Sequence, residues 1–282
     1  MKRFEGVFKL HDRQWREFRY VYPVVSRRAR GLSVGVNLNV DKACNFDCVY
    51  CQVDRSERQA GLKVDLAVLE QELRCLMADY HKLFEENEFR HVPPDWRRLN
   101  DIAFSGDGEP TASPVFAEAV QIGVDVRRDL GLSAAKIVVI TNACYLTRPK
   151  VAATLALLDE HNGEVWAKLD AGSEEYFRRV NRPSHTLQHV LDNILAAARV
   201  RPVVIQSLFL RLAGEPPSAA ELVAYAGRLA WLMEKGGQIA LVQIYTVARR
   251  PAEDYVSGLT AAELEAIAAR VRGLGLRAEC FA

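Results

Sequence analysis

Six short apolar runs, separated by longer amphipathic segments, constrain the fold of this 282-residue chain more than any other feature. The runs carry many β-branched residues, so each is a predicted strand. They span residues 32–38, 101–104, 136–140, 165–169, 203–210 and 239–245. The segments that separate them are predicted helices, over 64–86, 114–130, 150–161, 185–198 and 219–235.

The chain closes with one more helix and an apolar stretch. The helix is expected over 260–273, with Thr260 as its N-cap and Gly273 as its stop, and residues 276–281 could add a strand. Strands that alternate with helices are joined by right-handed crossovers and pair in parallel. Because no long linker or short-period repeat interrupts the pattern, residues 31–282 are predicted to form one α/β domain.

The first thirty residues are more basic than the rest of the chain. They hold nine Lys or Arg against three Asp or Glu, a balance of +6, whereas the whole chain has a net charge of +1. Such a segment could contact phosphates, or it could be a solvated lead-in to the first strand. We predict an N-terminal extension over 1–30 that packs on the main domain.

The sequence also bears on the location of the protein. No secretory signal follows Met1, and no apolar run approaches the ~20 residues that span a bilayer. We therefore expect a cytoplasmic protein with no membrane contact. Thiols stay reduced in the cytoplasm, so clustered cysteines there indicate metal binding rather than disulfides.

Polar side chains recur at the carboxyl ends of the predicted strands. They are Asn37, Asn39, Asn142, Lys168, Asp170, Gln206, Gln243 and Tyr245. Residues two apart on a strand point the same way, so each of three pairs is expected to share a face of its strand. The pairs are Asn37 with Asn39, Lys168 with Asp170, and Gln243 with Tyr245. Any one of them could simply end its strand. Their repetition favours a shared site, because parallel α/β folds keep their chemistry at this edge.

Three cysteines, Cys44, Cys48 and Cys51, stand four and three residues apart in CNFDCVYC, directly after the first predicted strand. A structural zinc site would need a fourth ligand. The remaining cysteines stand alone in the sequence: Cys75, Cys144 and Cys280. A catalytic zinc is disfavoured because three thiolates make the metal a poor Lewis acid. Iron–sulfur clusters are bound by cysteines at short spacings, and three thiolates leave one iron of a four-iron cluster open to another ligand.

The cysteine motif, with an aromatic residue before its last cysteine, resembles that of the radical S-adenosylmethionine (radical SAM) superfamily. The resemblance implies a 4Fe-4S cluster on the three cysteines, with Tyr50 near the adenine of the cofactor. A second motif, FSGDGEP over 104–110, resembles the segment of these enzymes that contacts the methionine end of S-adenosylmethionine. The cofactor-binding residues implied there are Ser105, Gly106, Asp107, Gly108 and Glu109. Glycines permit a tight turn, and a carboxylate suits an ammonium group.

The resemblance also refines the predicted fold. With six predicted strands, a partial (β/α)6 barrel of parallel strands with outer helices is favoured over a closed eight-stranded barrel. The open side of a partial barrel would admit a large substrate.

Longer stretches resemble the branch that contains the wyosine-type tRNA base synthetases and their bacterial relatives. These stretches are GVNLNVDKACNFDCVYCQVDR, WAKLDAGSEEYFRRVNRP and QSLFLRLAGEPPS. The resemblance places Asn142, Lys168, Asp170 and Gln206 among the ribose, carboxylate and substrate contacts. Lys168 could form a Schiff base with a keto acid, or it could form an ion pair with Asp170 or with the carboxylate of the cofactor. The synthetases that use pyruvate carry further N-terminal cysteines for a second cluster, whereas here no cysteine precedes Cys44.

The implied reaction is reductive cleavage of S-adenosylmethionine to a 5′-deoxyadenosyl radical, with flavodoxin or ferredoxin as the electron donor. Three hypotheses remain for its use. The enzyme could modify a nucleic-acid base, in tRNA above all, or it could act on a small molecule, a protein or a peptide, as activating enzymes do. A non-catalytic, metal-binding module associated with nucleic acid is the third, and the second motif counts against it. Arg249 and Arg250 could clamp a phosphate or carboxylate, or they could be solvated.

Overall fold

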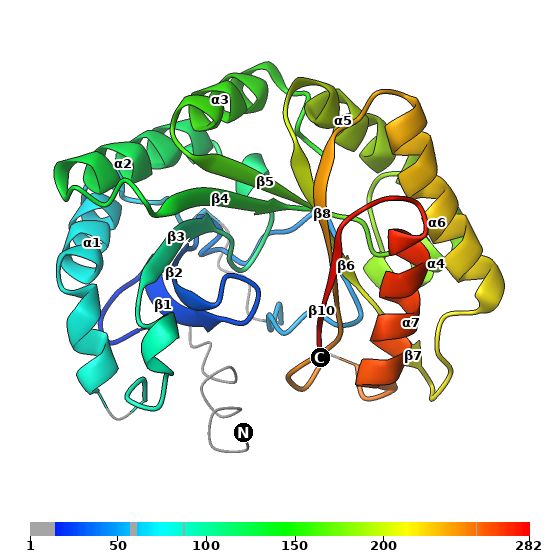
Figure 1. Ribbon diagram of the computed structural model, residues 1–282. Coiled ribbons are helices and arrows are strands. Elements are labelled where there is room, and N and C mark those ends of the chain that lie inside the picture. The colour runs from blue at the N-terminus through cyan, green and yellow to red at the C-terminus, as the bar shows by residue number, and fades with distance from the viewer. Residues whose placement is uncertain (1–14, 57–60, 87, 252) are drawn as a thin grey trace. The chain divides into compact units, whose positions relative to one another are not determined.

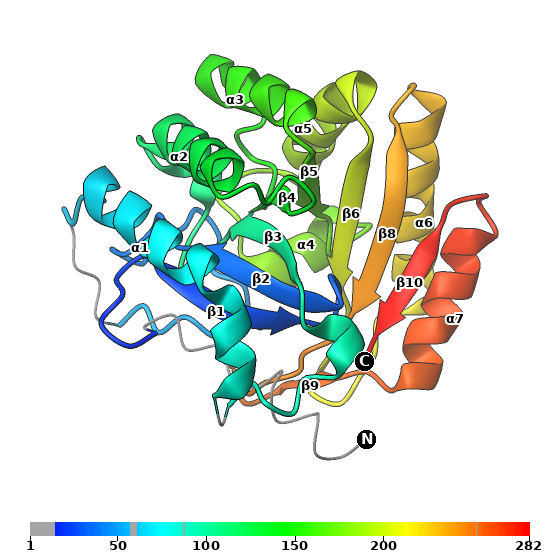
Figure 2. The same ribbon diagram turned by 60° about the vertical axis from the view of Figure 1, so that its left-hand side comes forward.

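The computed structural model describes residues 15–56, 61–86, 88–251 and 253–282 (Figures 1 and 2). Its internal contacts divide the chain into two compact units. The first comprises Met1–Ala43, Arg55–Ile140 and Ala153–Glu164, and the second comprises Cys44–Asp54, Thr141–Ala152 and Val165–Ala282. Among the residues so described, no helix has the length and apolar composition that crossing a bilayer would require.

The first unit is built on four neighbouring strands. In sheet order they are β1 (Val21–Ser26), β2 (Gly31–Val36), β3 (Leu99–Phe104) and β4 (Lys136–Thr141). Strand β1 pairs antiparallel with β2, whereas β2, β3 and β4 are parallel. The helices of this part are α1 (Leu66–Ala78), α2 (Phe116–Asp129) and the short 3-10 helices η2 (Tyr80–Glu85), η3 (Pro94–Trp96) and η4 (Pro110–Ala112). Helices α1 and α2 lie side by side along the outside of these strands (Figures 1 and 2).

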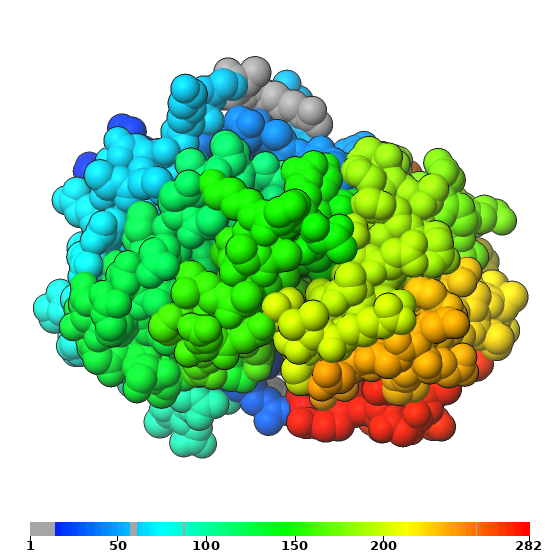
Figure 3. Space-filling model, turned by 90° about the horizontal axis from the view of Figure 1, so that it is seen from above, coloured from blue at the N-terminus to red at the C-terminus, as the bar shows by residue number. Residues whose placement is uncertain are grey.

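The second unit repeats the parallel arrangement. Its strands, in sheet order, are β5 (Gly163–Lys168), β6 (Val203–Leu208), β8 (Ile239–Tyr245) and β10 (Ala278–Phe281). Strands β7 (Leu210–Leu212) and β9 (Val256–Gly258) form a separate antiparallel pair. Helix α3 (Pro149–Glu160) lies mostly in the first unit, to which its residues from Ala153 onward belong. The helices of the second unit are α4 (Glu174–Asn181), α5 (Leu187–Val200), α6 (Ala219–Glu234) and α7 (Ala261–Arg272). The C-terminal third of the chain, yellow to red in the space-filling view, forms one continuous block of atoms (Figure 3).

The predicted elements are confirmed at all six apolar runs, and the closing stretch adds β10. Helix α7 begins with a capping box, in which Thr260 and Glu263 satisfy each other's backbone N–H groups, and Gly273 is its C-cap. The α/β class with parallel strands and outer helices is therefore confirmed. The predicted boundary between an extension over 1–30 and a domain over 31–282 stays a prediction.

The fold differs from the sequence-based expectation in several places. The strand predicted over 203–210 divides into β6 and β7, and β7 pairs with the unexpected strand β9. The helix predicted over 64–86 ends at Ala78 and continues as the 3-10 helix η2, which buries Leu83 and Phe84. Strand β1 was not expected because Pro23 interrupts its apolar run. It lies at the edge of the sheet, where a residue without an N–H is tolerated. Helix α4 was not expected either, because only Phe177 and Val180 mark its buried face among many charged residues.

Candidate functional site

The three-cysteine loop, residues 44–54, belongs to the second unit and is held by the end of helix α4. The N–H of Asp47 donates to the carbonyl of Asn181 at 3.2 Å, and the N–H of Val49 donates to the carbonyl of Val180 at 2.9 Å. The last carbonyls of a helix have no partner inside the helix, so the loop supplies the donors they lack. Beyond the C-terminal end of α4, the N–H of Ser184 donates to the carbonyl of Asn45 at 3.1 Å.

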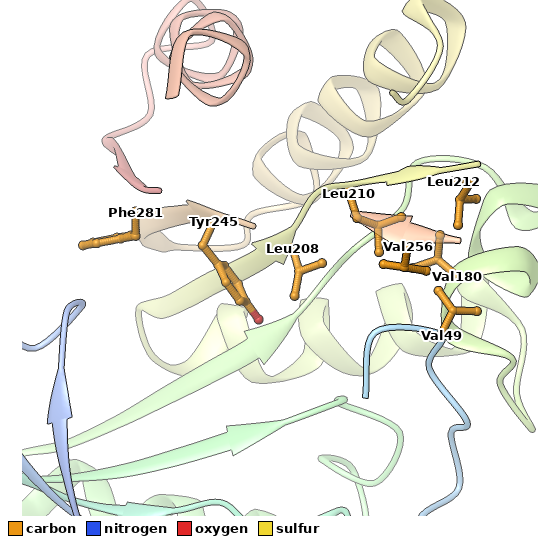
Figure 4. Close-up of a cluster of buried hydrophobic side chains, with 8 residues drawn as sticks. All are labelled: Val49, Val180, Leu208, Leu210, Leu212, Tyr245, Val256 and Phe281. Atoms are coloured by element: carbon orange, nitrogen blue, oxygen red, sulfur yellow. The ribbon is translucent and has the colours of Figure 1, made fainter. Parts of the chain in front are cut away.

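An apolar cluster lies beneath the loop. Val49 from the loop and Val180 from α4 lie close to the side chains of β7 and β9 (Figure 4). The cluster consists of Val49, Val180, Leu208, Leu210, Leu212, Tyr245, Val256 and Phe281. Burial of one loop side chain, together with the backbone bonds to α4, fixes the path of the chain between the cysteines.

Cys44, Cys48 and Cys51 are partly buried and form no disulfide. The N–H of Phe46 donates to the Cys44 sulfur at 3.5 Å, and the Asn181 side-chain nitrogen donates to the Cys48 sulfur at 3.5 Å. Burial raises the pKa of the Cys48 thiol to about 12, although the Lys168 ammonium opposes this rise. Because metals bind the thiolate, loading of this site would release a proton from Cys48.

The donor set, three cysteines on one short loop, is of the kind that binds iron–sulfur clusters. Within the described residues, no three His, Cys, Asp or Glu side chains are gathered as they would be around one metal ion. The fit to a cluster therefore rests on the chemical identity and the spacing of the donors. Hydrogen bonds such as those to the Cys44 and Cys48 sulfurs influence the reduction potential of a bound cluster.

Lys168 and Asp170 lie together at the end of β5, as predicted. The Lys168 ammonium is 3.6 Å from a carboxylate oxygen of Asp170 and donates to the Tyr245 hydroxyl at 2.9 Å. Burial alone would lower the pKa of Lys168, but the Asp170 carboxylate and the Tyr245 hydroxyl outweigh it and hold this pKa above its usual value. A lysine that forms a Schiff base needs a depressed pKa, so these neighbours favour the ion-pair role.

Asp170 is the centre of a buried hydrogen-bond network. Its carboxylate accepts from the Tyr50 hydroxyl, from the Asn181 side chain at 2.9 Å and from the N–H of Leu208 at 2.9 Å. Burial, and then the Asp170 charge, raise the pKa of Tyr50, which therefore stays a hydrogen-bond donor. Tyr50 and Asp170, predicted separately, are thus brought together by the structure.

The other predicted residues of this unit lie at neighbouring strand ends. The Gln206 side chain donates to Gln243 at 3.1 Å and accepts from the Tyr245 hydroxyl at 3.4 Å, so the predicted shared face of Gln243 and Tyr245 is confirmed. Asn142 donates to the side chain of Asn45 in the cysteine loop at 2.7 Å. It also accepts from the N–H of Cys144 at 3.2 Å.

The second motif lies in the first unit, where Asn37 organises its turn. The Asn37 side chain donates to the Asp107 carboxylate at 2.6 Å and accepts from the N–H of Asp107 at 3.1 Å. The carbonyl of Ser105 accepts from the Tyr22 hydroxyl at 3.2 Å. Glu109 is buried and caps η4, where its carboxylate accepts from the N–H of Thr111 at 3.1 Å.

The glycines of this turn allow a close approach of two backbone segments. A Cβ on Gly106 would overlap the Asn37 side chain, and one on Gly108 would overlap the carbonyl oxygen of Ala43. Replacing Gly108 with alanine is expected to lower the free energy of unfolding by about 1–3 kcal/mol, because backbone atoms must move to admit the methyl group. Urea unfolding measures the change.

Gly227 provides the matched control for that substitution. It lies on the exposed side of α6, and a Cβ added there would meet open space. Alanine at Gly227 should therefore stabilise the protein by roughly 0.5–1 kcal/mol, the ordinary gain from replacing a helical glycine. Equal effects of the two substitutions would contradict the close approach at Gly108.

The structure adds one residue that the sequence did not single out. Asn181, the last residue of α4, contacts Cys48, Tyr50 and Asp170 through one side-chain nitrogen. Its helix was not predicted, and no spacing relates it to the cysteines. Its only sequence signal is its place within the VNRP stretch of the quoted resemblance.

The remaining candidates are dispersed. Cys75 is exposed on α1, Cys144 is buried after β4, and Cys280 is partly buried in β10. Arg250 forms an exposed ion pair with Asp254 at 2.9 Å, which supports the solvated interpretation of that arginine.

A row of aromatic and basic side chains joins the loop after β4 to the first turn of α5. The Arg148 guanidinium lies 3.6 Å from the centre of the Tyr145 ring, which meets the His185 ring edge-on with ring centres 5.7 Å apart. His185 in turn stacks on His189, with ring centres 4.6 Å apart. Burial, and then the positive charges of His189 and Arg148, lower the pKa of His185.

Comparison with known proteins agrees with this geometry. The sequence profile of the Radical SAM superfamily matches residues 38–222, about two thirds of the chain. A UPF0026 protein of Methanocaldococcus jannaschii is 31% identical over 173 residues, which cover 61% of this chain and 46% of the relative. The chain spans about half the length of the curated relatives it matches.

Solved structures share the fold at low sequence identity. A radical SAM methyltransferase from Sphaerobacter thermophilus aligns with a TM-score of 0.61 at 16% identity, covering 93% of this chain and 68% of that one. TYW1 with a lysine–pyruvate adduct bound aligns with a TM-score of 0.50 at 14% identity, covering 96% and 80%. These likenesses show the fold alone, and they confirm the predicted class, an α/β fold of the partial-barrel type.

Proposed function

Because the chain belongs to the radical SAM superfamily, we propose that it binds a 4Fe-4S cluster through Cys44, Cys48 and Cys51 and uses S-adenosylmethionine. When bound, these groups supply a 5′-deoxyadenosyl radical that abstracts hydrogen from a substrate. The observation that carries the proposal is the cysteine loop. Its backbone is held by α4, and the sulfurs of Cys44 and Cys48 accept N–H···S bonds.

The protein's own residues bind and orient in this proposal. Ser105 to Glu109 hold the methionine end of the cofactor, with the buried Glu109 carboxylate as the partner of an ammonium group. Lys168, kept protonated by Asp170 and Tyr245, offers its ammonium to a carboxylate. Asn142, Asp170 and Gln206 supply further polar contacts. A cytoplasmic reductant such as flavodoxin or ferredoxin would deliver the electron.

Anaerobic reconstitution tests the proposal. Purified protein is supplied with iron and sulfide, its bound metal is quantified, and 5′-deoxyadenosine is assayed after addition of dithionite and S-adenosylmethionine. Iron and sulfide at one four-iron cluster per chain, together with formation of the nucleoside, would support the proposal. Bound zinc in place of iron, or no nucleoside from cluster-loaded protein, would overturn it.

A nucleic-acid base, in tRNA above all, is the substrate that one observation favours. The row of Arg148, Tyr145, His185 and His189 joins a guanidinium to stacked and edge-on rings on the surface of the second unit. Aromatic rings beside basic groups are the means by which proteins bind unpaired bases and their phosphates.

Replacing Tyr145 with alanine is therefore expected to weaken binding of tRNA about tenfold, because one stacked base is worth roughly 1–3 kcal/mol. Replacing Arg148 with alanine should also lower the dependence of binding on salt concentration, since a phosphate contact is lost. Filter binding across a salt series measures both effects. Arg270→Ala, on the exposed side of α7, is the matched control. Binding that neither variant changes would point to a small molecule or a peptide instead.

A further inference from the structure

Asn181 joins the backbone of the cysteine loop to the polar network around Asp170. Its backbone carbonyl accepts from the N–H of Asp47 at 3.2 Å, which ties the loop to α4. Helix α4 ends there because Arg182 adopts a left-handed conformation, with φ of 41°. The side chain is 1% exposed, so it contacts protein atoms on all sides.

The orientation of the Asn181 amide follows from its partners. Its nitrogen lies 2.9 Å from an oxygen of Asp170, 3.3 Å from the Tyr50 hydroxyl and 3.5 Å from the Cys48 sulfur. A carboxylate only accepts hydrogen bonds, so the NH2 group of the Asn181 amide, and not the amide oxygen, must face Asp170. The two amide hydrogens are thus directed at Asp170 and toward Cys48 and Tyr50.

A structural role alone does not account for this residue. The Asn181 side-chain oxygen is buried and has no hydrogen-bond partner among the residues that the structure describes. A buried acceptor without a partner costs about 1–3 kcal/mol, which an apolar side chain of similar size would avoid. The backbone carbonyl that holds Asp47 would be present with any residue at this position. What only the amide provides is the pair of N–H donors.

We propose that Asn181 is a positioning residue that sets the reduction potential of the cluster, through its N–H donated to the sulfur of Cys48. The inference rests on the proposed function, since it requires the cluster. Hydrogen bonds to the sulfurs are among the main determinants of cluster potential. A cluster gains negative charge on reduction, and a donor to a ligand sulfur stabilises that charge. Removal of the donor makes the cluster harder to reduce.

The test compares Asn181→Leu with Asn193→Leu in cluster-loaded protein. Asn193 is the matched control, because it is also a buried asparagine of the second unit. Its amide donates to the carbonyl of Cys144 at 2.8 Å and accepts from the Thr147 hydroxyl at 2.7 Å. Redox titration followed by electron paramagnetic resonance gives the midpoint potential of each variant, independently of any turnover.

Asn181→Leu is expected to lower the equilibrium constant for reduction about tenfold, which equals a potential about 59 mV more negative for one electron. Asn193→Leu should leave the potential unchanged. A midpoint potential in Asn181→Leu equal to that of the native protein, with iron and sulfide retained, would overturn the inference while leaving the proposed function intact. Native protein that binds no iron would overturn both.

A second measurement covers the case in which Asn181→Leu does not hold a cluster. Native protein labelled with ¹⁵N in its asparagine side chains is reduced, and pulsed electron paramagnetic resonance records magnetic coupling of the cluster to nitrogen. Coupling is expected from Asn181 and should persist in Asn193→Leu. A native spectrum without coupling to an asparagine side chain would contradict the proposed bond to Cys48.

Discussion

Replacing Cys48 with alanine is expected to abolish formation of 5′-deoxyadenosine, with a loss of at least about 100-fold. Changes to residues that merely support a metal ligand already cost about 10–100-fold in metal affinity or activity, and loss of the ligand itself should cost more. Cys48 is one of the three cysteines on the loop, and its removal would leave two ligands for a proposed cluster that needs three. The nucleoside is measured by chromatography, and bound iron and sulfide are measured in the same samples.

Cys75→Ala is the control for this experiment, because Cys75 is an exposed cysteine on helix α1. It should retain native iron content and native nucleoside formation. If Cys48→Ala kept both its iron and its activity, the assignment of the loop as the cluster site would be wrong. If Cys75→Ala lost iron as well, the cluster would involve a cysteine outside the loop.

The second large effect is expected on stability, from Asp170→Asn. This change removes a buried carboxylate and leaves the Lys168 ammonium, 3.6 Å away and 19% exposed, without its counter-charge. Breaking a buried ion pair by removing one partner costs about 3–5 kcal/mol. The residual exposure of Lys168 places the expected loss near the lower end, about 3 kcal/mol. Urea unfolding of the metal-free protein measures it.

A second substitution separates the charge effect from loss of the carboxylate's hydrogen bonds. Adding Lys168→Met to Asp170→Asn removes the stranded ammonium, so the double variant should be more stable than Asp170→Asn alone. Arg250→Ala is the comparison for an exposed ion pair, because the side chains of Arg250 and Asp254 are 86% and 84% exposed. This substitution should change the free energy of unfolding by less than about 0.5 kcal/mol. A double variant no more stable than Asp170→Asn would show that hydrogen bonding, rather than charge, dominates at Asp170.

The strands could be predicted from the sequence because each is marked by apolar residues that follow one another in the chain. Each run from residue 32 to 245 contains a parallel strand, and Lys168 and Asp170 share a face because alternate residues of a strand must do so. The three cysteines could also be found, since their spacing is visible in the chain. The spacing of the cysteines alone was compatible with zinc or with an iron–sulfur cluster. The resemblance to a known family then favoured the cluster.

Other parts of the site depend on contacts between distant segments and have no local signal. Asn181 lies 133 residues from Cys48, and the helix that carries it is short and mostly charged. The contact between the Asp170 carboxylate and the Leu208 N–H spans 38 residues and follows from the pairing of β5 with β6. Likewise, the row from Arg148 to His189 joins a loop after β4 to the start of α5, and its rings meet only after folding.

The attachment of the cysteine loop to α4 couples the order of two segments that lie far apart in the chain. Asp47 and Val49 donate their backbone hydrogen bonds to the carbonyls of Asn181 and Val180. Because fraying of the helix end would remove both acceptors, local opening of α4 would also release the backbone of the loop. The order of the three cysteines therefore depends on a short helix whose last residue lies 133 positions from Cys48.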